Sequence, residues 1–252
     1  MALVATPISV AQAASDSTPD LAVRTEAHVR VRVYNAAVVP AADQAVALRA
    51  AATILAAAGI GTSWLPCGDV TSDPTGTVCN TPLDPSELSV RLVRLPGTAS
   101  ARGELQLGYS LVDTAAGAGT LATIYADRVA WLAGEADADM PTLVGLAVAH
   151  EIGHLLLGTS AHSAKGLMRA VWSRAELQRN DAADWLFSQS DAVRMRSSVR
   201  RLEGLRSSQR DFHAAGCSPS FDGTSDPAAD TSECTTGGAV ASIRAVAAGT
   251  DR

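Results

Sequence analysis

The sequence predicts an α+β fold, in which a mixed, twisted β-sheet of about five strands is covered by a crossover helix, a central helix and a C-terminal helix. Two observations support this class. The 252 residues are 47% hydrophobic and 18% charged, which is the composition of a globular domain with a buried core. One strand-like segment precedes the first helical segment, and several strand-like segments follow before the next helix.

The first two elements differ in their periodicity. Residues His28 to Tyr34 alternate apolar and polar side chains, which is the period of a half-buried strand. Residues Pro40 to Ala58 are rich in Ala and Leu, and Gly59-Ile60-Gly61 follows. Because proline is favoured at a helix start and glycine after a helix end, this segment is predicted to be the crossover helix.

Further strands are predicted in the middle of the chain. Their expected ranges are Gly61 to Pro66, Leu88 to Leu95, Glu104 to Val112 and a fifth strand near Leu121 to Ala126. Segments rich in Gly, Pro, Asp and Ser separate them, as expected of turns.

Three helices are expected in the C-terminal half. Leu143 to Leu157, preceded by Pro141, is apolar almost all round, so this central helix must be buried. Gly158 fits the left-handed residue that ends such a helix. Ser173 and Glu176 form a capping-box pattern at the start of a second helix. A third helix is expected from Ser190 to Leu205, where an apolar stripe repeats at helical spacing.

The ends of the chain set the expected domain limits. Residues 1–14 are apolar and end in a small-x-small pattern that resembles a signal peptidase site, although Arg24 is the first basic residue. Residues 25–206 are expected to form one catalytic domain, and 207–252 a loosely ordered tail rich in small polar residues. The protein is therefore predicted to be secreted or periplasmic.

The four cysteines form two pairs that are close in sequence, and they are Cys67 with Cys79 and Cys217 with Cys234. An even number of cysteines without a C-x-x-C metal pair suits disulfide bonds in an oxidising compartment. The alternative is that they are free buried thiols.

The charge and hydropathy of the chain bear on its partners. A net charge of −6 argues against nucleic acid, for which clustered basic residues are expected. No uninterrupted apolar segment reaches the length of about 18 residues that a membrane span needs. We expect a monomer without a membrane span.

The segment from His150 to Met168 carries the chemistry, because three of the five histidines lie in it. On a helix His150 and His154 are one turn apart, so both imidazoles can reach one zinc ion at about 2.0–2.1 Å. Glu151 projects beside them and can take a proton from a water on that ion. The alternative is a pair of core histidines bonded to the backbone, which leaves ionisable groups buried at a cost of several kcal/mol unless they find partners. His162, after the turn at Gly158, is the third candidate ligand, although a surface loop is the default place for a lone histidine.

These residues resemble the signature of the metzincin zinc peptidases, especially the matrixin-like members, H-E-x-x-H-x-x-G-x-x-H followed by a methionine turn. The resemblance extends to the order of strands and helices along the domain. It implies that Met168 lies beneath the metal without binding it, with an ordinary core methionine as the alternative. It also implies that Trp172 lines a substrate pocket, with core packing as the alternative.

The same resemblance assigns a peptide-binding role to Gly108, Tyr109 and Ser110 within Leu107 to Leu111, as the edge strand that pairs with substrate. The motif departs from the family pattern, because it reads H-E-x-x-H-x-x-x-G-x-x-x-H and places His162 two residues late. No tyrosine follows Met168, and no cysteine-switch propeptide is visible.

The expected function is that of a zinc endopeptidase with one Zn²⁺ held by His150, His154 and His162, Glu151 as general base, and peptide or protein as substrate. Two alternatives are open. One is a zinc hydrolase that cleaves another bond, because fold and metal do not fix the bond. The other is a secreted binding protein that zinc stabilises, although a structural zinc site normally has four protein ligands and needs no acid beside them.

Overall fold

The computed structural model describes residues 27–68, 78–95, 105–179, 181–214 and 238–246. Its strands are β1 (Ala27–Asn35), β2 (Ile60–Cys67), β3 (Glu87–Val93), β4 (Leu105–Asp113), β5 (Ala118–Tyr125), β6 (Val171–Ser173) and β7 (Gly238–Val246). Its helices are α1 (Ala41–Ala57), α2 (Ala126–Ala136), α3 (Met140–Leu157), α4 (Arg174–Arg179) and α5 (Gln189–Ala214), with a short 3₁₀ turn at Ala182–Trp185. The coarse α+β prediction is confirmed.

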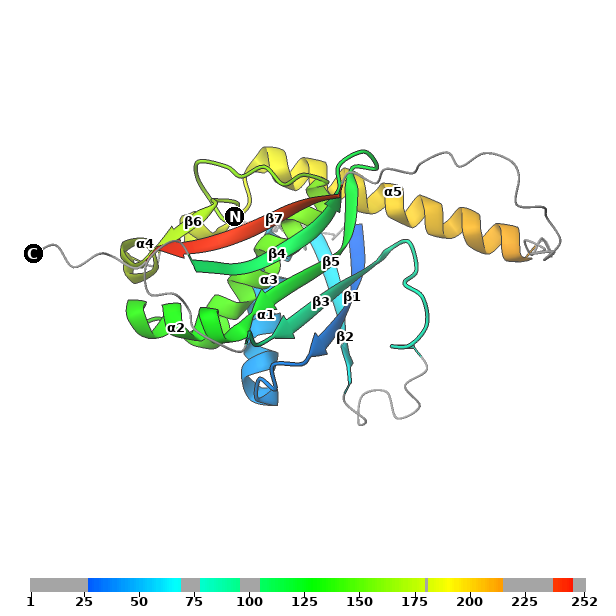
Figure 1. Cartoon of the computed structure of the whole chain (residues 1–252). Helices are drawn as coiled ribbons and strands as arrows, with labels where there is room; N and C mark the ends of the chain where they lie inside the picture. The colour runs from blue at the N-terminus through cyan, green and yellow to red at the C-terminus, as the bar shows by residue number, and fades with distance from the viewer. Residues whose placement is uncertain (1–26, 69–77, 96–104, 180, 215–237, 247–252) are drawn as a thin grey trace, which may run out of the picture.

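The strands form one mixed sheet in the order β2-β1-β3-β5-β4-β7-β6 (Figure 1). β1, β2, β3 and β5 run parallel, whereas β4 is antiparallel to both β5 and β7. The five strands predicted from the sequence are β1 to β5, and they are neighbours in the sheet. α1 connects the parallel strands β1 and β2, as expected of a crossover helix.

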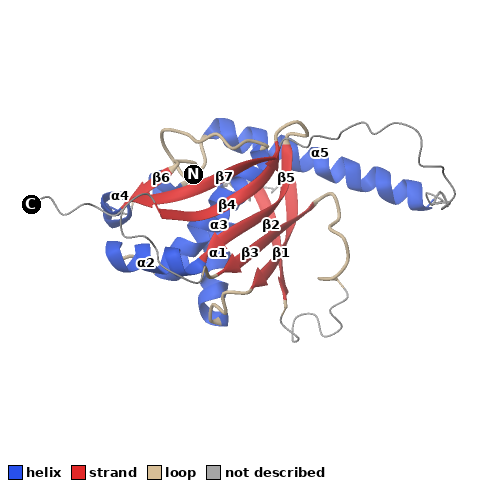
Figure 2. Ribbon diagram, viewed as in Figure 1, coloured by secondary structure: helices blue, strands red, loops and turns tan. Residues whose placement is uncertain are grey.

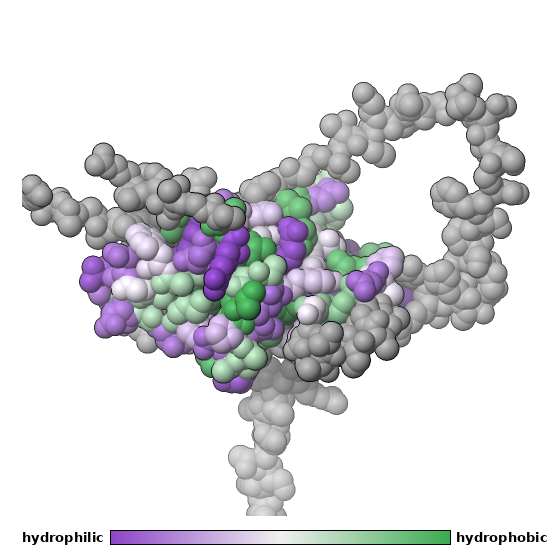
Figure 3. Space-filling model, turned by 60° about the horizontal axis from the view of Figure 1, so that its bottom comes forward, coloured by the Kyte–Doolittle hydropathy of each residue, from purple (hydrophilic) through white to green (hydrophobic). Residues whose placement is uncertain are grey.

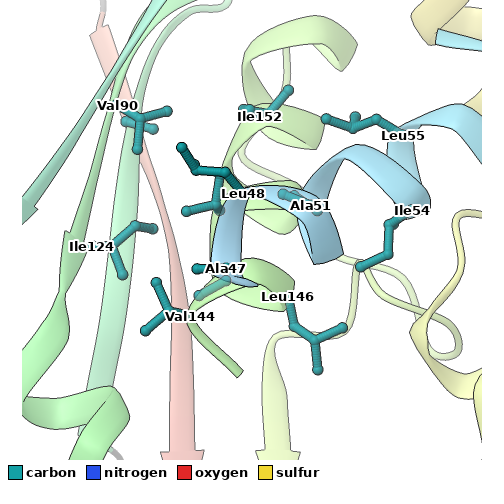
Figure 4. Packing of buried hydrophobic residues seen from close by; sticks show 14 of the residues in the cluster. Ala47, Leu48, Ala51, Ile54, Leu55, Val90, Ile124, Val144, Leu146 and Ile152 are labelled. Carbon is teal, nitrogen blue, oxygen red and sulfur yellow. The ribbon is translucent and has the colours of Figure 1, made fainter. Parts of the chain in front are cut away.

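Helices α1 and α3 pack side by side against the sheet (Figure 2). Gly145 permits their close approach, because a Cβ there would lie 2.4 Å from the carbonyl oxygen of Ala47 and 2.7 Å from the Ala50 Cβ. Leu48 and Ile152 lie between these helices and the strand residues Val90 and Ile124 (Figure 4). This core fixes α3, which carries the candidate metal ligands, relative to the sheet.

Helix α3 is also long and apolar enough to pass a length and composition test for a membrane span, and 78% of it is buried inside the fold. Such burial is typical of the core helix of a globular domain. Exposed large hydrophobic residues on the described surface come from separate elements, for example Val38, Trp131 and Val193. On the face shown in Figure 3, hydrophobic and hydrophilic residues are interspersed.

Helix α5 is held by arginines that donate to backbone carbonyls of other elements. Arg196 donates to Ala58 at the end of α1 (2.7 Å), Arg194 to Leu157 at the end of α3 (3.3 Å), and Arg201 to Gly117 between β4 and β5 (3.0 Å). The last carbonyls of a helix lack partners within the helix, so these bonds satisfy two helix ends as well as fixing α5.

Two expectations about the C-terminal part are corrected. The segment 207–252, expected to be loosely ordered, contributes the last turns of α5 and all of β7. Leu107 to Leu111 do not form an edge, because β7 pairs with β4 along Leu105 to Asp113. The physical reason that β7 was missed, and that β4 was taken for an edge, is that β7 pairs with β4 residues more than a hundred positions away, which local periodicity does not encode.

Candidate metal centre

The central helix α3 has clear sequence signals at both ends. Asp139 caps its start and accepts a hydrogen bond from the Thr142 amide at 2.9 Å, and Pro141 lies in the first turn. Gly158 ends it in the left-handed conformation, with φ of 63°. A side chain at Gly158 would collide with Gly117, since a Cβ would lie 2.2 Å from its carbonyl. The chain therefore turns sharply off the helix, toward His162.

The three histidines predicted as ligands converge. The Nε2 atom of His154 lies 2.9 Å from Nε2 of His150 and 3.2 Å from Nε2 of His162. Three imidazole nitrogens bound at about 2.05 Å around one tetrahedral zinc would be separated by about 3.3 Å. The three histidines can therefore hold one metal ion, because their candidate ligand atoms all lie within 4.8 Å of one another.

The opposite nitrogens of two of these rings fix their protonation. His150 Nδ1 donates to the Leu167 carbonyl at 2.7 Å, and His154 Nδ1 donates to the Thr159 carbonyl at 2.8 Å. In neutral rings the facing Nε2 atoms then carry lone pairs, so neither has a proton to share with the other. A cation bound by both nitrogens would remove the repulsion between their lone pairs. Carbonyl groups that accept from the other ring nitrogen are common behind metal-binding histidines.

Burial favours the neutral imidazoles that metal binding requires. Loss of solvent lowers the pKa of His150 well below its ordinary value of 6.5, and the nearby His154 lowers it further. Burial also lowers the pKa of His154 to about 4, against the opposing effect of its bond to Thr159. Both rings are fully buried and neutral near pH 7.

Helix α3 and the loop after Gly158 each absorb one of the two residues by which the motif exceeds the family spacing. α3 continues to Leu157, and Gly158 then directs the chain to Thr159, whose carbonyl accepts from His154. The loop closes through the Ser163 amide, which donates to the Met168 carbonyl at 2.8 Å. His162 reaches the other two rings from this loop despite the two additional residues of the motif.

Glu151 lies on the same helix and points toward β4. The Ser110 hydroxyl lies 2.6 Å from Glu151 Oε2 and 2.8 Å from the Glu151 carbonyl oxygen. A Cβ on Gly108 would come within 3.0 Å of Glu151 Oε1, so glycine at this position makes room for the carboxylate. Both Ser110 and Glu151 have no exposed surface. The carboxylate is therefore held in one place between α3 and β4.

No family model, curated protein or solved structure matches the chain. The resemblance to metzincins thus rests on the residues and their arrangement alone. That arrangement joins three convergent imidazoles, a buried carboxylate one position after the first of them, and a glycine turn before the third.

Met168 and Trp172 both lie close to the histidines. Met168 is 2% exposed, and its sulfur would meet a Cβ placed on Gly153 at 2.7 Å, so it packs against α3 between the two ligand positions. Trp172 is fully buried in β6, with its ring centroid 5.8 Å from that of His150 and 5.4 Å from that of Trp185. These positions are compatible with both the family role and the core-packing alternative for each residue.

The predicted strand residues divide between the two faces of β4. Gly108 and Ser110 face α3, whereas the Tyr109 ring lies 6.0 Å from that of Tyr125 and its hydroxyl lies 3.4 Å from Arg91. Sequence reasoning assigned Ser110 to substrate and missed its bond to Glu151. The alternation of a strand offered the signal, since Gly108 and Ser110 share a face.

The cysteine prediction is confirmed for one pair. Cys67 at the end of β2 forms a disulfide with Cys79, and the Cys79 carbonyl accepts a hydrogen bond from the Tyr34 hydroxyl at 2.9 Å. Cys217 and Cys234 lie outside the described residues, as does the expected leader 1–14.

Proposed function

We propose that this chain is a zinc-dependent endopeptidase that cleaves peptide bonds, with His150, His154 and His162 as metal ligands and Glu151 as general base. The observation that carries the proposal is the convergence of three Nε2 atoms next to a carboxylate that is itself held by Ser110. A structural zinc site normally has four protein ligands. Three ligands and an adjacent acid are the donor set of a catalytic site.

Each group of the chain has a defined task in this reaction. A zinc ion held by the three imidazoles would supply Lewis acidity to a water and to the substrate carbonyl. Glu151 accepts a proton from the attacking water and then delivers it to the nitrogen of the leaving amine. The Ser110 hydroxyl donates to Oε2 and so orients the carboxylate, with Oε1 on the side of Gly108. The carbonyls of Leu167 and Thr159 keep the protons of His150 and His154 on Nδ1.

The test compares wild type, Glu151→Gln and the control Glu135→Gln, which changes an exposed acid on α2. Each protein is purified without chelator, its metal content is measured by mass spectrometry, and its cleavage of a mixed peptide library is followed. We expect about one zinc per chain in all three and cleavage by wild type and control only. Zinc binding with equal cleavage in Glu151→Gln would contradict the proposed base. Zinc binding without cleavage by any of these proteins, or by a variant with Ser242→Pro and Ala245→Pro, would favour a metal-stabilised binding protein or another hydrolase.

A further inference from the structure

The backbone of β7 lies between β4 and β6, in a position that an extended peptide could take. β7 pairs antiparallel with β4 from Gly238 to Ala245 and parallel with β6 from Arg244 to Val246. Neighbouring strands are about 4.8 Å apart, so β4 and β6 are separated by about two strand spacings. One extended chain fills this space with main-chain hydrogen bonds on both sides (Figure 1).

The register places the C-terminal part of β7 beside the candidate metal centre. Ile243 pairs with Gly108, the glycine next to Glu151 Oε1. Ala245 pairs with Trp172, whose ring packs against that of His150. β7 also contacts α3, the helix that carries Glu151 and two of the three proposed ligands, His150 and His154. The backbone from Ile243 to Ala245 therefore runs between the two strands that touch the catalytic groups.

Three of the four side chains of the candidate site are buried, and His162 is half-buried. With β7 in place, His150, Glu151 and His154 have no exposed surface. A peptide bond from another protein must reach these groups to be cleaved. β7 is the last element of the described chain, and β2-β1-β3-β5-β4 remains a continuous sheet without it.

We infer that β7 occupies the space between β4 and β6, where the proposed peptidase would bind its substrate, as an intramolecular, substrate-like strand that slows the cleavage of other peptides. The inference rests on the proposed peptidase function and specifies how substrate binds. A substrate enters as an extended chain, antiparallel to β4 and parallel to β6, after β7 has left. The peptide bonds of substrate nearest to Glu151 then take the place of those between Ile243 and Ala245.

The test weakens β7 in the full-length chain. Prolines replace Ser242 and Ala245, which are three residues apart and so direct their backbone N–H groups to opposite sides of the strand. Proline removes a donor and is tolerated poorly within a sheet, so pairing with both β4 and β6 is lost. The control carries Ala229→Pro and Ser232→Pro, the same residue types at the same spacing outside β7.

Two readouts separate the inference from the function on which it rests. Amide hydrogen exchange is measured on zinc-loaded proteins that also carry Glu151→Gln, and peptide cleavage is measured with Glu151 intact. We expect exchange across β4 to accelerate at least tenfold in the β7 variant, with β1 and β3 unchanged. We expect peptide cleavage at least ten times faster than in wild type or the control.

Each other outcome overturns a different statement. If hydrogen exchange in β4 is unchanged, β7 does not occupy this site. If wild type, the β7 variant and the control cleave peptide equally fast, β7 does not block the site. In both cases the peptidase function stands if cleavage is seen. Faster exchange in β4 without cleavage by any protein overturns the peptidase proposal, and the peptide site with it.

Discussion

Replacing Ser110 by alanine tests whether this residue positions the general base. The hydroxyl lies 2.6 Å from Glu151 Oε2, and both groups are fully buried. A hydrogen bond to a charged acceptor contributes about 1.5–3 kcal/mol. Because that bond stabilises the ionised carboxylate, its loss should move the acid limb of the pH profile of kcat/KM upward by about 1–2 pH units.

The assay is the pH dependence of peptide cleavage, with zinc content measured on the same samples. Ser110→Ala should keep its zinc, because the Ser110 hydroxyl contacts Glu151 and not the histidines. Ser89→Ala, which removes a buried hydroxyl from β3, is the matched control and should leave the profile unchanged. An acid limb at the same pH in Ser110→Ala and wild type would refute the positioning role, even if total activity fell through loss of stability.

Three further predictions concern stability. In the metal-free protein His154 alone should account for a loss of about 2.5 kcal/mol in the free energy of unfolding between pH 6.5 and pH 4, because its pKa falls from 6.5 to about 4 on folding and the unfolded chain binds the proton first. Urea unfolding of metal-free wild type and His154→Gln measures this difference, and equal pH dependence in the two would contradict it. Gly158→Ala should lower the free energy of unfolding by at least about 2 kcal/mol, since φ at this position is 63° and the new Cβ would lie 2.2 Å from Gly117. The control Gly204→Ala, with open space around its Cβ in α5, should raise it by up to about 1 kcal/mol, and similar melting temperatures of the two variants would contradict the role of this turn. Removing the disulfide with Cys67→Ser and Cys79→Ser should lower the free energy of unfolding by about 3 kcal/mol. Reducing agent should lower the stability of wild type through this disulfide, an effect that the variant has lost.

Much of the fold was predictable because its elements carry local signals. The alternation of His28 to Tyr34 became β1, and the Ala-rich segment between Pro40 and Gly59 became α1. The capping box of Ser173 and Glu176 is present, since the Ser173 amide lies 2.9 Å from Glu176 Oε2, although the helix is only six residues long. Each of these signals acts within a few residues.

Other elements were missed for identifiable reasons. Helix α2 follows β5 without a turn, so its apolar stripe at Val129, Leu132 and Ala136 was hidden by the preceding strand. β6 has three residues, too few to show a period. β7 depends on partners in β4 and β6, and whether β4 is an edge strand depends on β7. Sheet order is a non-local property that a single sequence does not display.

The candidate site was predictable to a similar degree. The spacing of His150 and His154 predicts two candidate ligands on one face of the helix, with Glu151 beside them, because helix geometry is regular. His162 required the turn at Gly158 and the loop closed by Ser163 and Met168, which spacing alone does not define. The bond from Ser110 to Glu151 joins two elements 41 residues apart and emerged only from the packed fold.

The coordination of zinc in the purified full-length protein tests the metal centre most directly. X-ray absorption at the zinc edge measures the identity and distance of the ligands. Three imidazole nitrogens and one further oxygen or nitrogen at about 2.0–2.1 Å are expected, with the imidazole count reduced in His162→Ala. A sulfur ligand at about 2.3 Å, or an imidazole count that does not change in His162→Ala, would contradict the assignment of His150, His154 and His162 as the metal ligands.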